Sequence, residues 1–144
     1  MKLLAASVLA FALLVVPAAL AAGDGVMLAD EAAARAAEGR LTIIDVRTPG
    51  EWRSTGIPEG ATTVPINHPG GIEAFLEDVR AAVGGDKDRP IAFICAAGGR
   101  SSAAQKLARQ AGFTDVADID EGMLGSGSGP GWVARGLPTE PCDC

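Results

Sequence analysis

Residues 90–102 decide the fold, and they read PIAFICAAGGRSS. The first five form a continuous apolar run with the length and composition of a buried strand. Small residues follow Cys95, and residues 101–111 have helical spacing. This stretch therefore predicts a strand, a tight turn and a helix in succession. Cys95 then lies at the carboxyl end of the strand and faces the first turn of the helix.

The predicted position of Cys95 has chemical consequences. A thiol in front of a helix N-terminus lies close to unpaired backbone N–H groups and to the positive end of the helix dipole, which favours the thiolate. The same turn forms a cradle for an anion, because small residues let the backbone curl and present its amides. We therefore expect Cys95 to be the nucleophile and the next five residues to bind substrate: Ala96, Ala97, Gly98, Gly99 and Arg100.

The first 21 residues have the features of a secretory signal peptide. Lys2 gives a positive start, residues 3–20 form an apolar run, and residues 19–21 read Ala-Leu-Ala, a small-x-small cleavage pattern. A retained membrane anchor is the alternative, but Pro17 and the cleavage pattern argue against it. We expect cleavage after residue 21 and a periplasmic or secreted protein that is free of the membrane afterwards.

The mature chain, from residue 22 onward, is acidic and long enough for one domain. It keeps 123 of the 144 residues, and loss of Lys2 with the signal changes the formal net charge from −6 to −7. That length suffices for a single hydrophobic core. Because lysine and arginine do not cluster, nucleic acid and anionic membranes are not expected as partners. The sequence has no clear apolar seam, so we expect a monomer.

Helix-like and strand-like segments alternate along the mature chain. Helices are predicted at residues 30–38, with Asp30 as N-cap, at 72–83 and at 101–111, with a last helical turn at 132–137. Strands are predicted at residues 41–46, 61–66, 90–95 and 115–119. Such alternation predicts a parallel sheet covered on both faces, with a site at the carboxyl ends of its strands. Cys95 and Asp45 both end strands, so we expect them at one rim.

Four segments, in order, resemble the signatures of rhodanese-like domains. They are residues 41–52 (LTIIDVRTPGEW), residues 56–61 (GIPEGA), residues 94–101 (ICAAGGRS), and a C-terminal group made of residues 122–123 and 132–138. The resemblance covers about residues 26–138. It implies an α/β rhodanese-like fold, with a central, mostly parallel sheet of about five strands and helices on both faces. We therefore divide the mature chain into a rhodanese-like domain, residues 22–138, and a cysteine-containing tail, residues 139–144.

The resemblance also implies an activity. In this family a cysteine thiolate attacks the outer sulfur of a donor such as thiosulfate, becomes a persulfide, and passes the sulfur to a thiol or to cyanide. Cys95 matches the catalytic position, and no cofactor is implied. From Cys95 to Arg100 the loop has six residues, as in the sulfurtransferases. The related phosphatases have a longer loop, so phosphatase and arsenate reductase activities are disfavoured.

Four other polar residues are candidates for roles around Cys95. Arg100, the only cation of the loop, has two alternative roles: it contacts an anionic donor or persulfide, or it forms a salt bridge with Asp45 or Glu51. Asp45 is expected to accept loop N–H groups and brace the turn, and Arg47 to pair with an acidic neighbour such as Glu51. Ser101 is expected to cap the following helix.

Two further features are expected to be peripheral. His68 is the only histidine, and its setting in residues 67–70 (NHPG) reads as an exposed turn rather than as a catalytic partner of Cys95. Residues 126–131 (SGSGPG) look inserted relative to the family. A segment of this composition has little reason to be ordered, so we expect a surface insertion rather than a docking loop.

The tail carries Cys142 and Cys144, for which three alternatives remain, in order of preference. They form a local disulfide, they accept sulfur from Cys95 or protect it as a resolving pair, or they bind a metal, for which further ligands are lacking. The principal hypothesis is a sulfurtransferase that uses a small sulfur-donor anion and a thiol or cyanide acceptor, with a protein acceptor as a further option. The alternatives are a non-catalytic protein-binding module, or a thiol redox partner that uses Cys142 and Cys144.

Overall fold

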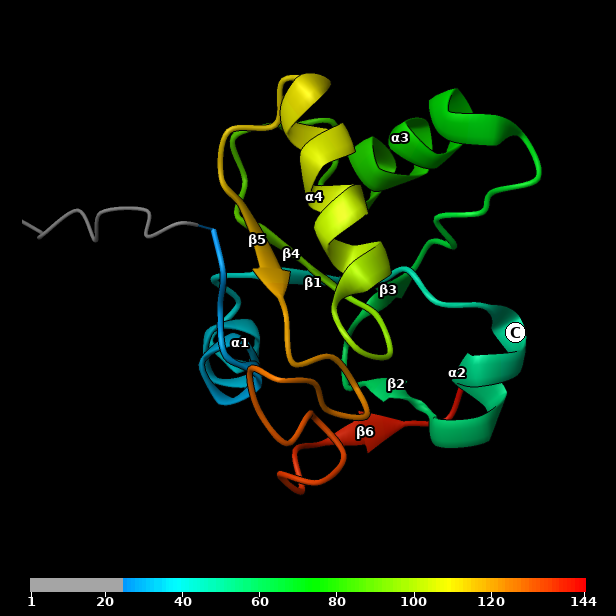
Figure 1. Ribbon diagram of the computed structural model, residues 1–144. Helices are drawn as coiled ribbons and strands as arrows, with labels where there is room; N and C mark the ends of the chain where they lie inside the picture. Colours follow the sequence, from blue (N-terminus) through cyan, green and yellow to red (C-terminus); the bar gives the residue numbers. More distant parts are fainter. Residues whose placement is uncertain (1–24) are drawn as a thin grey trace, which may run out of the picture.

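A computed structural model describes residues 25–144; the predicted signal peptide, residues 1–21, lies outside them. Its centre is a parallel sheet with strand order β3-β1-β4-β5 (Figure 1). The strands are β1 (Thr42–Asp45), β3 (Thr62–Thr63), β4 (Ile91–Ile94) and β5 (Val116–Ile119). This confirms the predicted α/β fold. The sheet has four strands rather than about five, because Val26 adds only an isolated parallel bridge to Asp118 at the β5 edge.

Helices cover both faces of the sheet (Figure 1). α1 (Ala29–Ala37) lies on one face, and α3 (Gly71–Ala82) and α4 (Gly99–Gln110) lie on the other. Side chains alternate along β1, so that Ile44 packs in the core under α3 and α4 while Ile43 packs in the core under α1. Within residues 25–144 no helix is long and apolar enough to cross a membrane.

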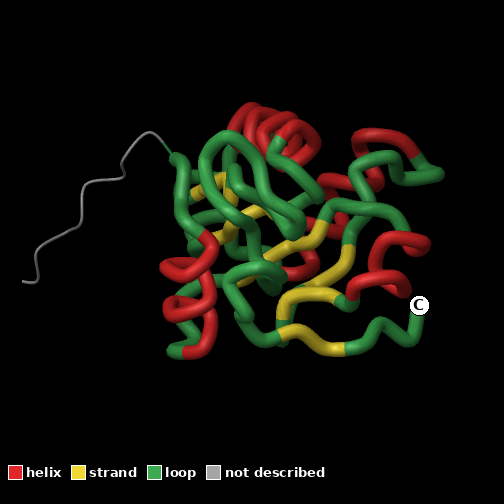
Figure 2. The backbone as a smooth tube through the Cα atoms, turned by 60° about the horizontal axis from the view of Figure 1, so that its bottom comes forward, coloured by secondary structure: helices red, strands yellow, loops and turns green. Residues whose placement is uncertain are grey.

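A short helix and a small second sheet lie beside the central sheet. α2 (Pro49–Thr55) begins at a capping box, in which Thr48 and Glu51 each accept a backbone N–H of the other, and Pro49 occupies its first turn. β2 (Ile57–Pro58) pairs antiparallel with β6 (Thr139–Glu140). This pairing brings the C-terminal tail beside α2, as both ribbon and tube show (Figures 1 and 2).

Three local predictions are wrong. Leu28, not Asp30, is the N-cap of α1, and Asp30 lies in the first turn. Residues 132–137 form successive turns rather than a helix, because Gly131 and Gly136 adopt left-handed backbone there. Residues 126–131 are ordered: the Ser126 N–H donates to Gly129 O at 3.0 Å, and the Ser126 hydroxyl donates to Asp120 O at 3.1 Å. Hydrogen bonds within the segment, and from it to Asp120, hold the segment in place.

Glu121 is a fully buried carboxylate that ties three segments together. Its Oε1 accepts the N–H of Ala29, at the start of α1, at 2.7 Å, and its Oε2 accepts the N–H of Gly131 and the Nε of Arg135, each at 2.8 Å. Burial alone would raise the pKa of Glu121, but Arg135 and the two backbone donors outweigh it and hold that pKa below its usual value. Glu121 thereby fixes the chain immediately after β5.

We predict that Glu121→Ala lowers the free energy of unfolding by about 2–4 kcal/mol, because two backbone N–H groups and Arg135 lose a buried acceptor. Urea unfolding measures this loss. Since the folded-state pKa of Glu121 is depressed, its stabilisation is present above the ordinary value of 4.5 and disappears as the pH falls below it. The control is Glu38→Ala, which removes an exposed ion pair with Arg40 and costs about 0–1 kcal/mol. Equal unfolding midpoints for the two variants would contradict the prediction.

Candidate active site

Cys95 follows directly after β4, and its side chain is buried, with 1% of the residue exposed. Its Sγ accepts the backbone N–H of Gly98 at 3.1 Å and lies 3.4 Å from the hydroxyl of Ser101. One N–H and one hydroxyl therefore point to the sulfur, in place of the full ring of amides that the sequence suggested. The Gly98 N–H stabilises a thiolate more than a neutral thiol, and the Ser101 hydroxyl, which donates to Gly98 O, is close enough to turn to the sulfur.

The loop after Cys95 is held from behind by the chain that follows β5. Met123 N–H donates to Cys95 O at 2.8 Å, and Leu124 N–H donates to Ala96 O at 2.9 Å. Gly98 has a left-handed backbone (φ 95°), and a side chain there would collide with the Asp120 carbonyl. Only glycine satisfies both constraints at this N-cap of α4. Ala97 and Gly99 are exposed at the outer side of the loop.

Ser101 does not cap the following helix. Gly98 is the N-cap of α4 and has no side-chain cap, while Ser101 lies inside the first turn and is fully buried. Its hydroxyl donates to Gly98 O at 3.0 Å, with the Cys95 sulfur at 3.4 Å. The sequence prediction was wrong because the helix begins two residues earlier than the helical spacing indicated, which turns Ser101 toward the sulfur.

Arg100 forms a bidentate ion pair with Glu51 of α2, with two N–O distances of 2.7 Å. Of the two roles considered for Arg100, this arrangement is the salt bridge. The Arg100 guanidinium lowers the pKa of Glu51 to about 2, with Thr48 adding further hydrogen bonds. About a third of each side chain is exposed, so the pair lies at the edge of the site, in reach of solvent.

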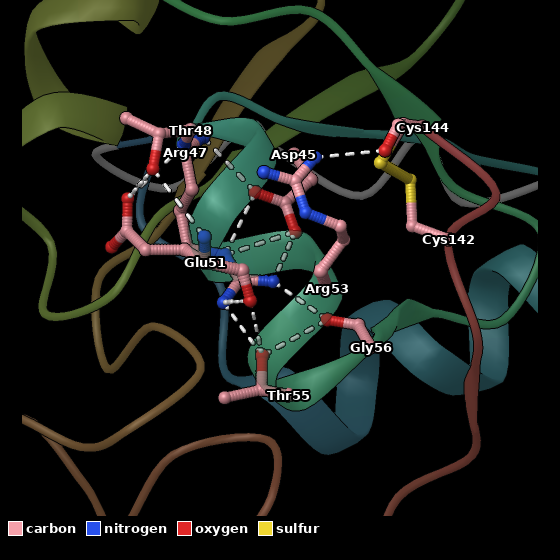
Figure 3. The surroundings of a disulfide bond; sticks show 9 residues. All are labelled: Asp45, Arg47, Thr48, Glu51, Arg53, Thr55, Gly56, Cys142 and Cys144. Atoms are coloured by element: carbon pink, nitrogen blue, oxygen red, sulfur yellow. Dashed lines mark hydrogen bonds and ion pairs between the residues drawn. A yellow bond between two sulfur atoms is a disulfide. The ribbon is translucent and has the colours of Figure 1, made fainter.

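Asp45 and Arg47 form a buried ion pair at the carboxyl end of β1, with Nη2 and Oδ2 2.7 Å apart (Figure 3). Arg47 pairs with an acidic neighbour, as predicted, but the partner is Asp45 rather than Glu51, whose carboxylate is taken by Arg100. The prediction that Asp45 accepts N–H groups of the Cys95 loop is wrong: the only backbone N–H that it accepts within residues 25–144 is that of Arg47. Arg47 also donates to the Thr55 hydroxyl and to Gly56 O, each at 2.8 Å, at the end of α2.

A buried acid that the sequence analysis missed lies next to the loop. Asp118 of β5 is 3% exposed, and burial raises its pKa to about 6, an effect that the hydroxyl of Ser101 opposes. Its signal in the sequence is a single acid in the strand Val-Ala-Asp-Ile, where the neighbouring residues are apolar.

Cys142 and Cys144 form a disulfide in the C-terminal tail (Figure 3). Arg53, on α2, donates to the Cys144 carbonyl at 2.8 Å and thereby holds the end of the tail against that helix. His68 is remote from this chemistry: its Nδ1 accepts the Gly70 N–H at 2.9 Å and its Nε2 lies 3.1 Å from Asp78. Among residues 25–144, no cluster of His, Cys, Asp and Glu side chains is suited to hold a metal ion.

Two surface cavities lie away from Cys95. One, of about 250 Å³, lies between α1 and Trp132, and the other, of about 370 Å³, is lined in part by three arginines near the start of β1 and β4: Arg35, Arg40 and Arg89. Neither is lined by residues 95–101.

The geometry agrees with comparison to known proteins. The family described as “Rhodanese-like domain” matches residues 28–126, more than half of the chain. The chain belongs to the rhodanese-like domain family. An uncharacterized protein of Rickettsia prowazekii is 28% identical to this rhodanese-like domain over 98 residues, which cover 67% of this chain and 80% of that protein.

Solved structures share the fold. The crystal structure of the Alr3790 protein from Anabaena superposes with a TM-score of 0.63 at 29% identity, covering 81% of this chain and 82% of that one. The solution structure of a 30 kDa polysulfide-sulfur transferase homodimer from Wolinella succinogenes superposes with a TM-score of 0.61 at 25% identity, covering 82% and 79% respectively. The rhodanese-like fold predicted from the loop and its flanking signatures is therefore confirmed.

We predict that Arg47→Met lowers the free energy of unfolding by about 3–5 kcal/mol, because it leaves the Asp45 carboxylate buried without its partner. The double variant Arg47→Met/Asp45→Asn removes the charge as well and recovers part of that loss. Urea unfolding of the two single variants and the double variant gives the coupling energy. Strictly additive losses would show that the pair does not interact in the folded protein.

Proposed function

We propose that the protein is a sulfurtransferase that carries a sulfane sulfur as a persulfide on Cys95. The observation that carries this proposal is the environment of the sulfur. Cys95 begins a six-residue loop, and its Sγ receives the Gly98 N–H at 3.1 Å, with the Ser101 hydroxyl at 3.4 Å. Donors fixed in this way stabilise an anionic sulfur without a cofactor. Membership of the rhodanese-like family, which includes sulfurtransferases, supports the same reaction class.

The reaction needs only a donor with a sulfur–sulfur bond. The Cys95 thiolate attacks the outer sulfur of thiosulfate, a new S–S bond forms, and sulfite leaves with the electron pair of the broken bond. The resulting persulfide then passes its terminal sulfur to a thiol or to cyanide and regenerates the thiolate. A polysulfide is an alternative donor, since a structural neighbour is a polysulfide-sulfur transferase.

The electrostatics favour a small donor. Glu51 neutralises Arg100 through two hydrogen bonds, so this cation is not available as an unpaired anchor for a large anion. The full sequence carries a formal net charge of −6, which repels anions at long range. Recognition therefore rests on the loop amides and on Ser101. We propose that the protein acts as a monomer on such donors.

The disulfide in the tail supports a second candidate function. Cys142 and Cys144 are joined, and Arg53 holds the tail on α2, the helix whose Glu51 binds the active loop through Arg100. As a dithiol, the pair would take the sulfur from the Cys95 persulfide, close to the disulfide and release hydrogen sulfide. A thiol reductant must then reopen the disulfide for each turnover.

We predict that incubation with thiosulfate adds one sulfur atom to Cys95, because it is the free cysteine of residues 25–144. Mass spectrometry of the intact protein and of its peptides locates the adduct, and Cys95→Ser is the matched control. Added cyanide should remove the sulfur and yield thiocyanate. Loss of the adduct without cyanide, in prereduced protein but not in Cys142→Ser/Cys144→Ser, would favour the tail as acceptor. No adduct from thiosulfate or polysulfide would overturn the enzyme and leave the protein-binding module.

We also propose that the protein is exported and acts in the periplasm or outside the cell. The support is the apolar run and the Ala-Leu-Ala pattern of residues 3–21. Expression of the full chain in a bacterium should yield a product that begins at Ala22 in the periplasmic fraction or the medium. N-terminal sequencing of each fraction measures this. A product that retains residues 1–21 in the membrane fraction would instead support an anchor.

A further inference from the structure

Asp118 is a buried acid that the proposed reaction does not use. It is 3% exposed, and its Oδ1 has no hydrogen-bond partner within residues 25–144. Its backbone N–H and carbonyl are both occupied, by Gly25 O at 2.6 Å and by the Met27 N–H at 2.9 Å. An unpaired carboxylate at this depth is costly, and burial accordingly raises the pKa of Asp118 to about 6.

The sheet places this acid on the same side as the Cys95 sulfur. Asp118 pairs with Phe93 in the neighbouring strand, and Cys95 is two residues beyond Phe93, so all three side chains point to the same face of the sheet. That face is covered by α4, whose first turn brings in Ser101. The Ser101 hydroxyl donates to Gly98 O at 3.0 Å and lies 3.4 Å from Cys95 Sγ, and it lowers the pKa of Asp118.

We propose that Asp118 is a positioning residue that acts through the Ser101 hydroxyl to set the charge on the Cys95 sulfur. A hydroxyl has one hydrogen to donate and two lone pairs to accept with. Protonated Asp118 can donate to Ser101, and the Ser101 hydrogen can then turn from Gly98 O to the thiolate or persulfide. Ionised Asp118 attracts that hydrogen and adds a negative charge next to the sulfur, and both effects disfavour the thiolate. The proton moves between Asp118 and solvent, and no other bond changes.

The groups around Asp118 leave it without a neutralising partner. Asp120 adds a like charge from the chain after β5, and its repulsion contributes to the raised pKa. On α4, Gln105 and Arg109 both donate to Val116 O rather than to the acid. The segment 25–27, which lies along the outer edge of β5, has no titratable side chain. Arg100 is bound to Glu51 of α2.

The inference rests on the proposed function in one respect: the Cys95 thiolate is taken to be the reactive species. The experiment that tests it measures the thiolate and does not require sulfur transfer. The chain has three cysteines and no tyrosine, and Cys142 and Cys144 are joined. The ultraviolet absorbance of thiolate therefore reports Cys95 alone, with Cys95→Ser as the baseline. We expect Asp118→Asn to lower the pH at which half of the thiolate has formed by about one unit, a tenfold change in the equilibrium.

Two variants make the test specific. Asp115→Asn, an exposed acid just before β5, controls for net charge and should leave the midpoint unchanged. In a Ser101→Ala background the effect of Asp118→Asn should fall to a small remainder, because the hydroxyl that connects the two groups is gone. An unchanged midpoint in Asp118→Asn would overturn the proposal. An equal shift with and without the Ser101 hydroxyl would also overturn it, in favour of direct repulsion.

A stability measurement guards against misfolded variants. The pKa of Asp118 is raised in the folded state, so its ionisation costs stability as the pH rises from about 4 to about 6. Asp118→Asn should therefore have a higher urea midpoint than wild type at about pH 8, and the two midpoints should converge below about pH 4. A variant that is less stable at every pH would show a structural role instead. If the titration behaves as expected but no sulfur adduct forms, the proposed function fails and the inference stands.

Discussion

The buried ion pair between Asp45 and Arg47 is the interaction on which the site depends. Neither charge is exposed, so each needs the other. The geometry that satisfies them also fixes α2, because Arg47 uses its remaining donors on Thr55 and Gly56 at the end of that helix. With α2 fixed, Glu51 projects toward Arg100 and holds the outer side of the Cys95 loop. A charge pair at the end of β1 thus controls a loop at the end of β4.

The two sides of the loop are held by different chemistry. On the outer side, an ion pair in contact with solvent connects Arg100 to Glu51 of α2. Such a pair contributes little to the free energy of unfolding, but it orients the Arg100 side chain. On the inner side, backbone hydrogen bonds from Met123 and Leu124 hold the loop from behind. Rigid support on the inner side keeps the Gly98 N–H on the sulfur, and preorganised donors of this kind stabilise an anion most effectively. The outer side is the one by which a donor can enter.

The sequence predicted the elements whose own pattern is strong and missed those that depend on distant contacts. β4, α3 and α4 are apolar or periodic over enough residues to be recognised. β2 and β6 have two residues each and exist only because they pair with each other across 81 and 83 positions of the sequence. α2 was not predicted, although Thr48 and Glu51 have the spacing of a capping box. The partner of Glu51 could not be predicted, because Asp45, Arg47 and Arg100 offer several pairings that only the fold distinguishes.

Asp118 and Glu121 show why burial alone does not define the state of an acid. They lie three residues apart on the chain that passes behind the Cys95 loop, and both are buried. Glu121 accepts two backbone N–H groups and Arg135, so its pKa falls and it keeps its charge. For Asp118, burial and the like charge of Asp120 outweigh the Ser101 hydroxyl, which acts in the opposite direction, so its pKa rises. The charged Glu121 can therefore stabilise the fold at neutral pH. Asp118, whose pKa is about 6, costs stability at neutral pH because its charge is buried without a partner. A titrating acid beside a nucleophilic sulfur fits a role in chemistry better than a role in packing.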